Sequence, residues 1–312
     1  MDKMNFELIK KIIGNISRVI VGKKEAIELL LVTLLADGHA LLEDVPGVGK
    51  TLIAKSLAKS IKGSFNRIQF TPDLLPSDIT GFNIYNQKEG KFEFKQGPVL
   101  TNVLLADEIN RAIPRTQSSL LESMEERQVT IDGKTYPLPK PFFLIATQNP
   151  IELEGTFPLP EAQLDRFLIK INIGYPNEEE EISILKRFQK DDPLISLKPV
   201  ATPKQIITMQ QMCKKITLSS PVHKYIIDII SSTRNNKKLR FGVSPRGSLG
   251  LMRAAQGLAV VKGRNYVIPD DVKELIKPVL AHRIILNEEE KLRGETPENI
   301  LEEIISQTPV PD

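Results

Sequence analysis

The stretch LLEDVPGVGKT, residues 41–51, has the form of a phosphate-binding loop with one unusual position. In the usual pattern, G-x-x-x-x-G-K-[ST], glycines, a lysine and a hydroxyl surround the phosphates of a nucleotide. Gly49, Lys50 and Thr51 match that pattern, but Asp44 occupies the place of the first glycine. The question is whether a carboxylate there prevents the loop from binding a nucleotide.

The rest of the loop retains what phosphate binding requires. Gly47 and Gly49 let the backbone approach the phosphates because they carry no β-carbon. Lys50 can reach the β- and γ-phosphates, and the Thr51 hydroxyl can bind Mg²⁺. A strand-like apolar run precedes the loop and a helical apolar pattern follows it, so the helix N-terminus faces the anion. The stretch therefore predicts nucleotide binding.

A pair of carboxylates follows another apolar run, NVLLADE at 102–108. Asp107 can hold Mg²⁺ through water, and Glu108 can orient or deprotonate an attacking water. The simpler interpretation is a solvated acidic loop, but a protein that only binds nucleotide does not need Glu108. The pair favours ATP hydrolysis.

A polar residue follows a further apolar run, FFLIAT at 142–147. The amide of Asn149 could contact the γ-phosphate or position the attacking water. An Asn before Pro is usually a turn residue. Its place beyond a strand of the same sheet favours the functional interpretation.

The first half of the chain predicts an α/β domain. Short apolar runs alternate with helical segments, as in a parallel sheet that is buried on both faces. Two segments, 82–98 and 127–139, instead read as hairpins that turn at Glu89-Gly90 and Asp132-Gly133. The strand-like runs lie at 39–44, 67–71, 102–108, 142–147 and 167–173.

The chain changes character at about residue 198, where the strand-like runs stop. A helix and loop at 175–193 would connect to a separate all-helical lid domain. We therefore predict an α/β nucleotide-binding domain at 1–190 and a lid at 191–312. Hydroxyl residues before proline mark the expected helix starts in the lid, where the hydroxyl can cap free N–H groups: Thr202-Pro203, Ser220-Pro221, Ser244-Pro245 and Thr296-Pro297.

The composition is that of an ordinary globular protein, with 41% hydrophobic and 26% charged residues among 312. A net charge of +3 does not by itself indicate a nucleic-acid partner. The single cysteine, Cys213, is interpreted as a buried small hydrophobe and suits a reducing compartment. Without a signal peptide or a long apolar span, the sequence predicts a cytoplasmic protein.

Taken together, these residues resemble the AAA+ ATPase superfamily, and more closely its MoxR branch. The resemblance covers roughly residues 15–285, and its run from Ile145 to Phe167 is far more specific than any single nucleotide motif. The phrases that carry it are LLEDVPGVGKT, QFTPDLLPSDITG, LLADEINRA, LLESMEERQVT, IATQNPIELEGTFPLPEAQLDRF and SPRG.

The resemblance implies a five-stranded parallel sheet between helices, with β-hairpin insertions, followed by an all-α lid. It also implies a homo-hexameric ring that binds ATP and Mg²⁺ at subunit boundaries. Thr51 and Asp107 would bind the metal. The nucleotide would contact Val21 and Gly22 in an adenine pocket and, in the loop, Pro46, Gly47, Val48, Gly49, Lys50, Thr51 and Leu52.

Two arginines gain catalytic roles from the resemblance, beside Glu108 and Asn149. Arg166, in LDRF, resembles the arginine finger that reaches a neighbour's γ-phosphate; the alternative is a local ion pair with Asp165 or a surface charge. Arg246, in SPRG, resembles the sensor-2 arginine. A cation in the first turn of a helix gains nothing from the helix dipole, which favours an anionic partner outside the helix. Whether Arg246 serves its own nucleotide or a neighbour's stays open.

Asp44 departs from the superfamily pattern G-x-P-G-x-G-K-T, whereas EDVPGVGKT suits the MoxR branch. Asp44 lies at the exit of the first strand, before the tight part of the loop. We therefore expect it to point away from the nucleotide. The loop should bind ATP.

The resemblance implies a chaperone-like remodeller that matures or activates partner proteins, often through a von Willebrand factor A domain protein. Metal or cofactor insertion into a client enzyme is one form of this. A nucleic-acid motor is the main alternative, but the lysines of the first hairpin are nearly balanced by glutamates. A magnesium-chelatase-like motor subunit is another, and would differ mainly in its partner. A scaffold that does not hydrolyse ATP would have no need of Glu108 or Arg166.

Overall fold

The computed structural model describes residues 3–45, 47–149 and 155–311. Its central sheet has five parallel strands in the order β2-β5-β8-β1-β9, so the five strands predicted from the sequence all form. The loop of residues 44–49 therefore leaves the sheet between two parallel neighbours. The strands are β1 (Ala40–Glu43), β2 (Phe65–Gln69), β5 (Val103–Asp107), β8 (Phe143–Gln148) and β9 (Ile169–Ile171).

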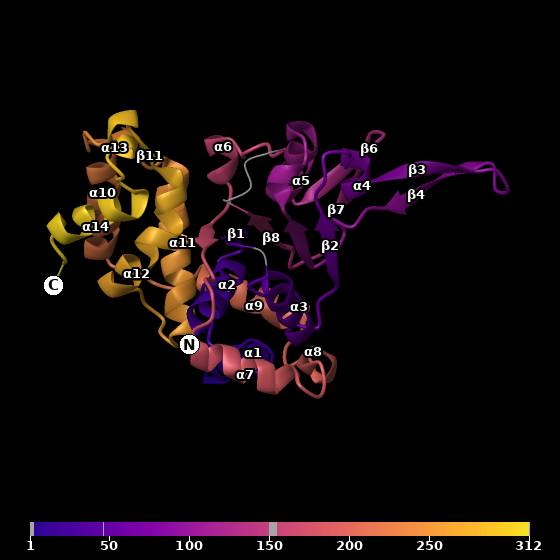
Figure 1. Ribbon diagram of the computed structural model, residues 1–312, viewed down its shortest axis with the longest axis horizontal. Helices are drawn as coiled ribbons and strands as arrows, with labels where there is room; N and C mark the ends of the chain where they lie inside the picture. The colour runs from indigo at the N-terminus through magenta and orange to yellow at the C-terminus, as the bar shows by residue number, and fades with distance from the viewer. Residues whose placement is uncertain (1–2, 46, 150–154, 312) are drawn as a thin grey trace.

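Both faces of the sheet are buried, which explains why its strands read as continuous apolar runs. Alternate residues point to opposite faces: Leu104 belongs to one core cluster and Leu105 to the other. Figure 1 shows helices on both sides of the sheet. One face carries α1 (Lys3–Ser17), α2 (Lys24–Leu35) and α3 (Lys50–Ser60), and the other carries α4 (Pro76–Thr80) and α5 (Pro114–Glu126).

Two hairpins extend from this domain, as predicted. The first, β3 (Gly81–Asn86) with β4 (Lys91–Gln96), projects far beyond the sheet (Figure 1). The second, β6 (Gln128–Ile131) with β7 (Lys134–Pro137), turns at Asp132 and Gly133, which both have positive φ. The short η1 (Ile109–Arg111) lies between β5 and α5 (Pro114–Glu126), and α6 (Glu161–Leu164) lies between β8 and β9. The helices α7 (Glu178–Phe188) and α8 (Pro193–Ser196) follow β9 and lead into the C-terminal part.

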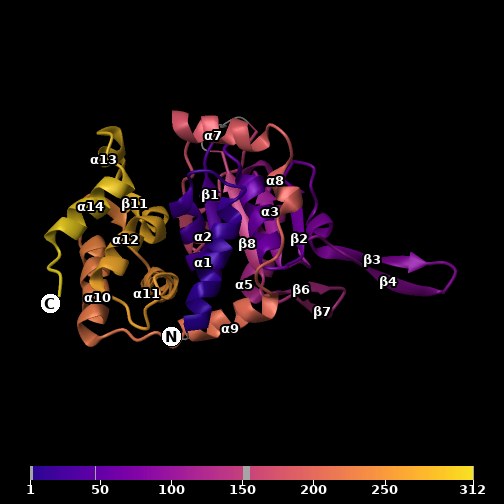
Figure 2. The same ribbon diagram turned by 90° about the horizontal axis from the view of Figure 1, so that it is seen from below.

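The C-terminal part is helical apart from a short two-stranded pairing, and α10–α14 form a separate group in Figures 1 and 2. Its buried residues belong to the same core cluster as those of α1–α3. The domain boundary at residue 190 stays a prediction. The elements are α9 (Pro203–Cys213), α10 (Ser220–Arg234), β10 (Leu239–Phe241), α11 (Pro245–Val261), α12 (Pro269–Leu280), η2 (Ala281–Arg283), β11 (Ile285–Leu286), α13 (Glu288–Leu292) and α14 (Pro297–Gln307).

Hydroxyl side chains cap four helices of this part, three of them where the sequence predicts. Thr202, Ser244 and Thr296 each accept a backbone N–H of the first helical turn. The fourth prediction is wrong by one residue, because Ser219 rather than Ser220 caps α10. Proline then occupies the second position of that helix, where it still displaces no intrahelical hydrogen bond.

Cys213 is buried, as the sequence predicts, and burial raises the pKa of its thiol to about 12. An uncharged thiol in that position behaves as a small apolar side chain. No described helix is long and apolar enough to cross a membrane.

Candidate active site

The phosphate-binding loop joins the carboxyl end of β1 to α3. Gly47 has a φ of +89° and Gly49 a φ of +91°, values that side chains with a β-carbon rarely adopt. The space beside both α-carbons is open, with no atom within 4 Å of where a β-carbon would lie. Backbone N–H groups with open space before a helix N-terminus fit an anionic phosphate. Val48, Thr51 and Leu52 flank these glycines and are half-buried, and Pro46 lies outside the described residues.

Lys50 lies between the loop and the acidic pair. Its side-chain Nζ donates to the carbonyl oxygen of Asp44 at 2.8 Å, and the residue is 8% exposed. Burial lowers the pKa of Lys50, while the carboxylates of Asp107, Asp44 and Glu108 oppose that shift. The ammonium group is therefore close enough to these carboxylates for their charges to act on it.

The carboxylate of Asp44 is occupied by backbone groups. One oxygen accepts from the N–H of Val45 at 2.8 Å. The other accepts from Ile173 at 2.7 Å and Gly174 at 2.6 Å, in the loop after β9. These bonds direct the side chain towards the neighbouring strand's exit rather than towards the open space beside Gly47.

Asp107 ends β5 and is fixed by two neighbouring strands. Thr147 of β8 donates to its Oδ1 at 2.7 Å, and Arg67 of β2 donates to its Oδ2 from Nε at 3.0 Å and Nη2 at 2.7 Å. The aspartate is 8% exposed, so its charge is held in place by a buried hydroxyl and a guanidinium.

Glu108 follows with a φ of +57°, an uncommon value for a residue with a side chain. Its N–H donates to Thr147 Oγ1 at 2.8 Å. Its carboxylate accepts from Gln69 Nε2 at 2.6 Å and lies 3.1 Å from Arg111 Nε. Strain at one residue supported by several hydrogen bonds is typical of functional sites.

Arg67, Gln69 and Thr147 are site residues that the sequence analysis did not single out. A signal was present, because polar side chains interrupt the apolar runs RIQFT and FFLIAT. Parallel pairing sets Gln69 opposite Asp107. Asn149, only 5% exposed, follows β8 at the same edge of the sheet.

A cavity of about 410 Å³ adjoins this edge, between the start of α2, the end of β9 and the lid. Gly22 lines it, with Ile173 from the loop after β9 and Pro278 and Ala281 from the lid. Val21, the other predicted adenine contact, is half-buried next to Gly22 and is not among the residues that line the cavity. The volume lies within the range of small-molecule sites.

The residues at this edge could hold Mg²⁺ only if a nucleotide supplied further ligands. Among the described residues, no group of three or more His, Cys, Asp and Glu could hold a metal ion. Thr51 and Asp107 offer the hydroxyl and carboxylate oxygens that Mg²⁺ prefers, and this ion usually takes its other ligands from phosphates and water.

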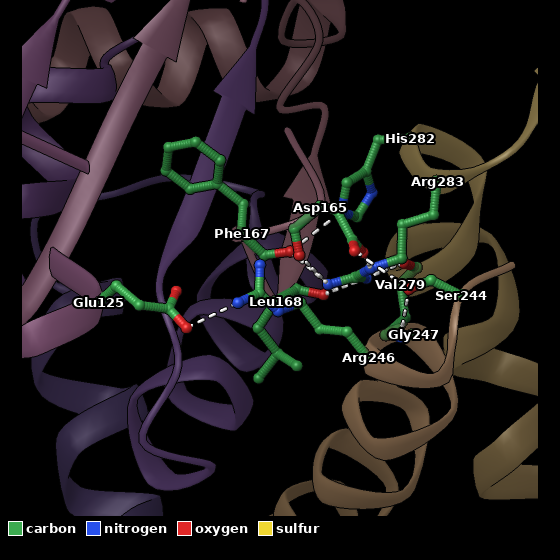
Figure 3. A network of polar contacts seen from close by, with 10 residues as sticks. All are labelled: Glu125, Asp165, Phe167, Leu168, Ser244, Arg246, Gly247, Val279, His282 and Arg283. Carbon is green, nitrogen blue, oxygen red and sulfur yellow. Dashed lines mark hydrogen bonds and ion pairs between the residues drawn. The ribbon is translucent and has the colours of Figure 1, made fainter. Parts of the chain in front are cut away.

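A second cavity, of about 490 Å³, gathers arginines at the opposite edge of the sheet. Residues 37–39, which precede β1, line it together with Arg166, which precedes β9. The lid contributes Arg246, whose Nη2 lies 2.7 Å from Glu125 Oε1 (Figure 3). Arg127, Arg253 and Arg283 also line the cavity.

Asp165 does not pair with its neighbour Arg166, so that alternative for Arg166 is wrong. It instead forms an ion pair with Arg283, whose Nε lies 2.7 Å from Asp165 Oδ1. Arg166 is half-buried, and its side chain makes no hydrogen bond or ion pair within the described part of the chain. Its guanidinium is available to an anion from outside.

The two groups of predicted site residues lie at opposite edges of one sheet. The loop with Lys50 and the acidic pair follow the carboxyl ends of β1 and β5, whereas Arg166 precedes the amino end of β9. Because β1 and β9 are parallel neighbours, these ends point in opposite directions. The structure thus brings Lys50, Asp107, Glu108 and Asn149 to one edge, and Arg166 and Arg246 to the other.

Known proteins similar to this chain share both of its parts. Residues 39–169 match the family described as ATPase family associated with various cellular activities (AAA), and residues 231–304 match the AAA lid domain. Uncharacterized protein YeaC of Bacillus subtilis is 51% identical over 97% of this chain and 95% of its own length. Chaperone MoxR1 of Mycobacterium tuberculosis is 44% identical over 97% and 82%. The crystal structure of a Cytophaga hutchinsonii protein assigned as an ATPase has a TM-score of 0.93 and 42% identity, over 99% and 96%.

Proposed function

The chain belongs to the MoxR family of AAA+ ATPases, and we propose that its copies form a closed, hexameric ring that hydrolyses each ATP between two of them. One observation carries the proposal: Arg166 and Arg246 line a cavity at the edge of the sheet opposite to Lys50. A strand of four residues such as β1 spans roughly 13 Å. This separation supports the proposal that Arg166 acts on the ATP of the next copy, and we propose the same role for Arg246 rather than one at its own nucleotide.

Each residue has a role in that reaction. Lys50 binds the outer phosphates, Glu108 takes a proton from the attacking water, and Asn149 positions that water against the γ-phosphate. Arg166 and Arg246 supply fixed positive charge where negative charge develops in the transition state. Fingers of this kind are worth on the order of 10³–10⁵ in rate in related phosphoryl-transfer systems.

The remaining loop and cavity residues bind the nucleotide. The backbone from Pro46 to Leu52 surrounds the phosphates, and Val21 and Gly22 border the adenine. Thr51 and Asp107 would hold Mg²⁺, which neutralises charge on the β- and γ-phosphates when it is bound.

The work done with ATP is proposed to be chaperone-like remodelling of partner proteins. A relative named Chaperone MoxR1 supports this, at 44% identity over nearly the whole chain. The proposal includes a von Willebrand factor A domain protein as partner and maturation of client proteins, with metal or cofactor insertion as one form. A cytoplasmic location fits the buried thiol of Cys213.

The ring is tested by ATP hydrolysis measured over a range of protein concentrations, beside Glu108→Gln, Arg166→Ala and Arg246→Ala. Specific activity should rise with concentration, and all three variants should lose it while Glu108→Gln still binds ATP. Activity that is independent of concentration and survives Arg166→Ala would refute a site shared between copies.

A mixture of two inactive variants tests the shared site directly. Arg166→Ala retains its own acidic pair and needs an arginine from outside, whereas Glu108→Gln is inactive at its own site but can supply that arginine. Mixed before ATP is added, the two should regain activity that neither has alone. No recovery would contradict the cross-subunit site.

The nucleic-acid motor is not favoured by these relatives or by the projecting hairpin. Its Lys91 pairs with Glu89, and Glu93 adds a second negative charge, so the lysines of this hairpin are nearly balanced by carboxylates. Binding to single-stranded DNA should be weak at low salt and change little at moderate salt. A steep loss between the two would support the motor instead.

A further inference from the structure

Arg283 hydrogen-bonds the backbone of the segment that carries Arg166. The side chain of Arg283 is 2% exposed, and the residue lies in η2 of the lid. Nη2 donates to the carbonyl oxygens of Asp165 at 3.2 Å and Phe167 at 2.6 Å, and Nη1 donates to that of Leu168 at 3.1 Å (Figure 3). The acceptors thus lie on both sides of Arg166.

The rest of the guanidinium is also occupied. Nε donates to the carboxylate of Asp165 at 2.7 Å, and Nη1 also donates to the carbonyl oxygen of Val279. An arginine has five N–H donors in a rigid plane, and all five are used here. His282 adds a contact of 3.0 Å between its Nε2 and the carbonyl oxygen of Phe167.

Asp165 extends this network to the helix that carries Arg246. Its second carboxylate oxygen accepts from the hydroxyl of Ser244 at 3.0 Å. Ser244 is the N-cap of α11 and accepts from the N–H of Gly247 at 3.3 Å, so Arg246 lies within the capped turn. A β-carbon on Gly247 would lie 2.4 Å from Cγ1 of Val243 and 3.1 Å from Cδ of Arg283, so the helix packs closely against both side chains at this glycine.

We propose that Arg283 is a positioning residue that holds Arg166 and Arg246 in one arrangement for the neighbour's ATP, a proposal that rests on the cross-subunit site proposed above. Joining the lid to the sheet would not by itself require a buried charge, since apolar side chains can do so. A planar fork that binds carbonyls on both sides of Arg166 fixes the backbone from which that side chain projects. Lysine has three donors on a flexible stem and cannot reproduce this.

The mixture of Arg166→Ala and Glu108→Gln can show in which of the two partners Arg283 acts on ATP hydrolysis. Arg283→Lys added to the Glu108→Gln partner, which supplies the arginines, should lower the kcat of the mixture by about 10²-fold, the loss expected for a displacement of roughly 1 Å. KM for ATP should stay within about twofold, because substrate binding uses the other partner. Arg283→Lys added to the Arg166→Ala partner should leave the rate nearly unchanged.

The outcomes separate the two proposals. No recovery in the mixture without Arg283→Lys would refute the shared site itself. If Arg283→Lys lowers the recovered activity equally in either partner, the shared site is retained but Arg283 is only a structural contact.

Ser244→Ala and Ser219→Ala give a second test if Arg283→Lys does not fold. Both serines cap a lid helix and accept one N–H, at 3.3 Å from Gly247 and 3.4 Å from Val222. Only Ser244 also contacts Asp165. In the arginine-supplying partner, Ser244→Ala should lower kcat several-fold more than Ser219→Ala; equal effects would overturn the proposal.

Discussion

Replacing Asp44 by alanine should lower the thermal stability of this chain without weakening ATP binding by as much as tenfold. The carboxylate accepts three backbone N–H groups, from Val45, Ile173 and Gly174, at 2.6–2.8 Å. A hydrogen bond to a charged group contributes about 1.5–3 kcal/mol when it is buried. Asp44 is half-buried and water can replace part of each bond, so about 1 kcal/mol per bond is expected.

The three bonds together give a loss of about 3 kcal/mol. In a chain of this size 1 kcal/mol shifts the Tm by roughly 2–4 °C, so a decrease of roughly 6–12 °C is expected. Thermal unfolding followed by circular dichroism measures this decrease. Titration of ATP onto Glu108→Gln, with and without Asp44→Ala, measures the affinity.

Asp192→Ala is the matched control, because Asp192 accepts a single backbone N–H, from Leu194 at 2.8 Å. Its Tm should decrease by about a third as much. Equal decreases for the two variants would refute the account of Asp44. Tenfold or tighter ATP binding in Asp44→Gly would show that this carboxylate faces the nucleotide after all.

Three further outcomes follow from the site. Glu125→Gln releases Arg246 from an ion pair whose side chains are 45% and 40% exposed; such pairs contribute at most about 1 kcal/mol, so ATP hydrolysis at limiting protein should rise by up to about fivefold. Gln69→Ala removes one of the two partners of the Glu108 carboxylate, leaving Arg111, and should raise the basal kcat by up to about tenfold at unchanged ATP affinity. Burial, and after it the charge of Arg127, lowers the pKa of His39 in the folded chain. The stabilisation from neutral His39 is therefore fully present above about pH 6.5 and is lost as the pH falls below that value. Urea unfolding at several pH values should show a decrease in the free energy of unfolding of up to about 1.4 kcal/mol per pH unit.

Each of these has its own control. Glu122→Gln removes the same charge from α5 and should leave hydrolysis unchanged, since Glu122 makes no ion pair within the described residues; an equal rise there would contradict the role given to Glu125. A fall in kcat for Gln69→Ala would mean that this amide supports Glu108 rather than restrains it. His39→Asn keeps an acceptor for the N–H of Leu144 and should flatten the pH dependence; an unchanged slope would assign it to other groups.

The nucleotide loop could be predicted from the sequence because its requirements are local. The positive φ angles of Gly47 and Gly49, the start of α3 at Lys50 and the apolar strand before them are all set by residues within about ten positions. The hairpin turn at Asp132-Gly133 is local in the same way.

The partners of the acidic pair could not be predicted in this way. Arg67 and Gln69 reach Asp107 and Glu108 only because β2 is paired with β5, some 40 residues later in the chain. Nothing near Asp165 in sequence indicates that it pairs with Arg283 rather than with Arg166, because the two partners are 118 positions apart.

The sequence by itself determined that this chain binds and hydrolyses ATP, since the loop and the acidic pair are short patterns whose backbone conformations depend on neighbouring residues. Only the tertiary structure decided at which edge of the sheet Arg246 lies. The lid packs against the amino-terminal edge of the sheet through Asp165 and Arg283, and so places Arg246 beside Arg166 and away from Lys50. The physical reason is that a parallel sheet separates the two ends of its strands, and only the packing of distant segments selects the end to which each side chain belongs.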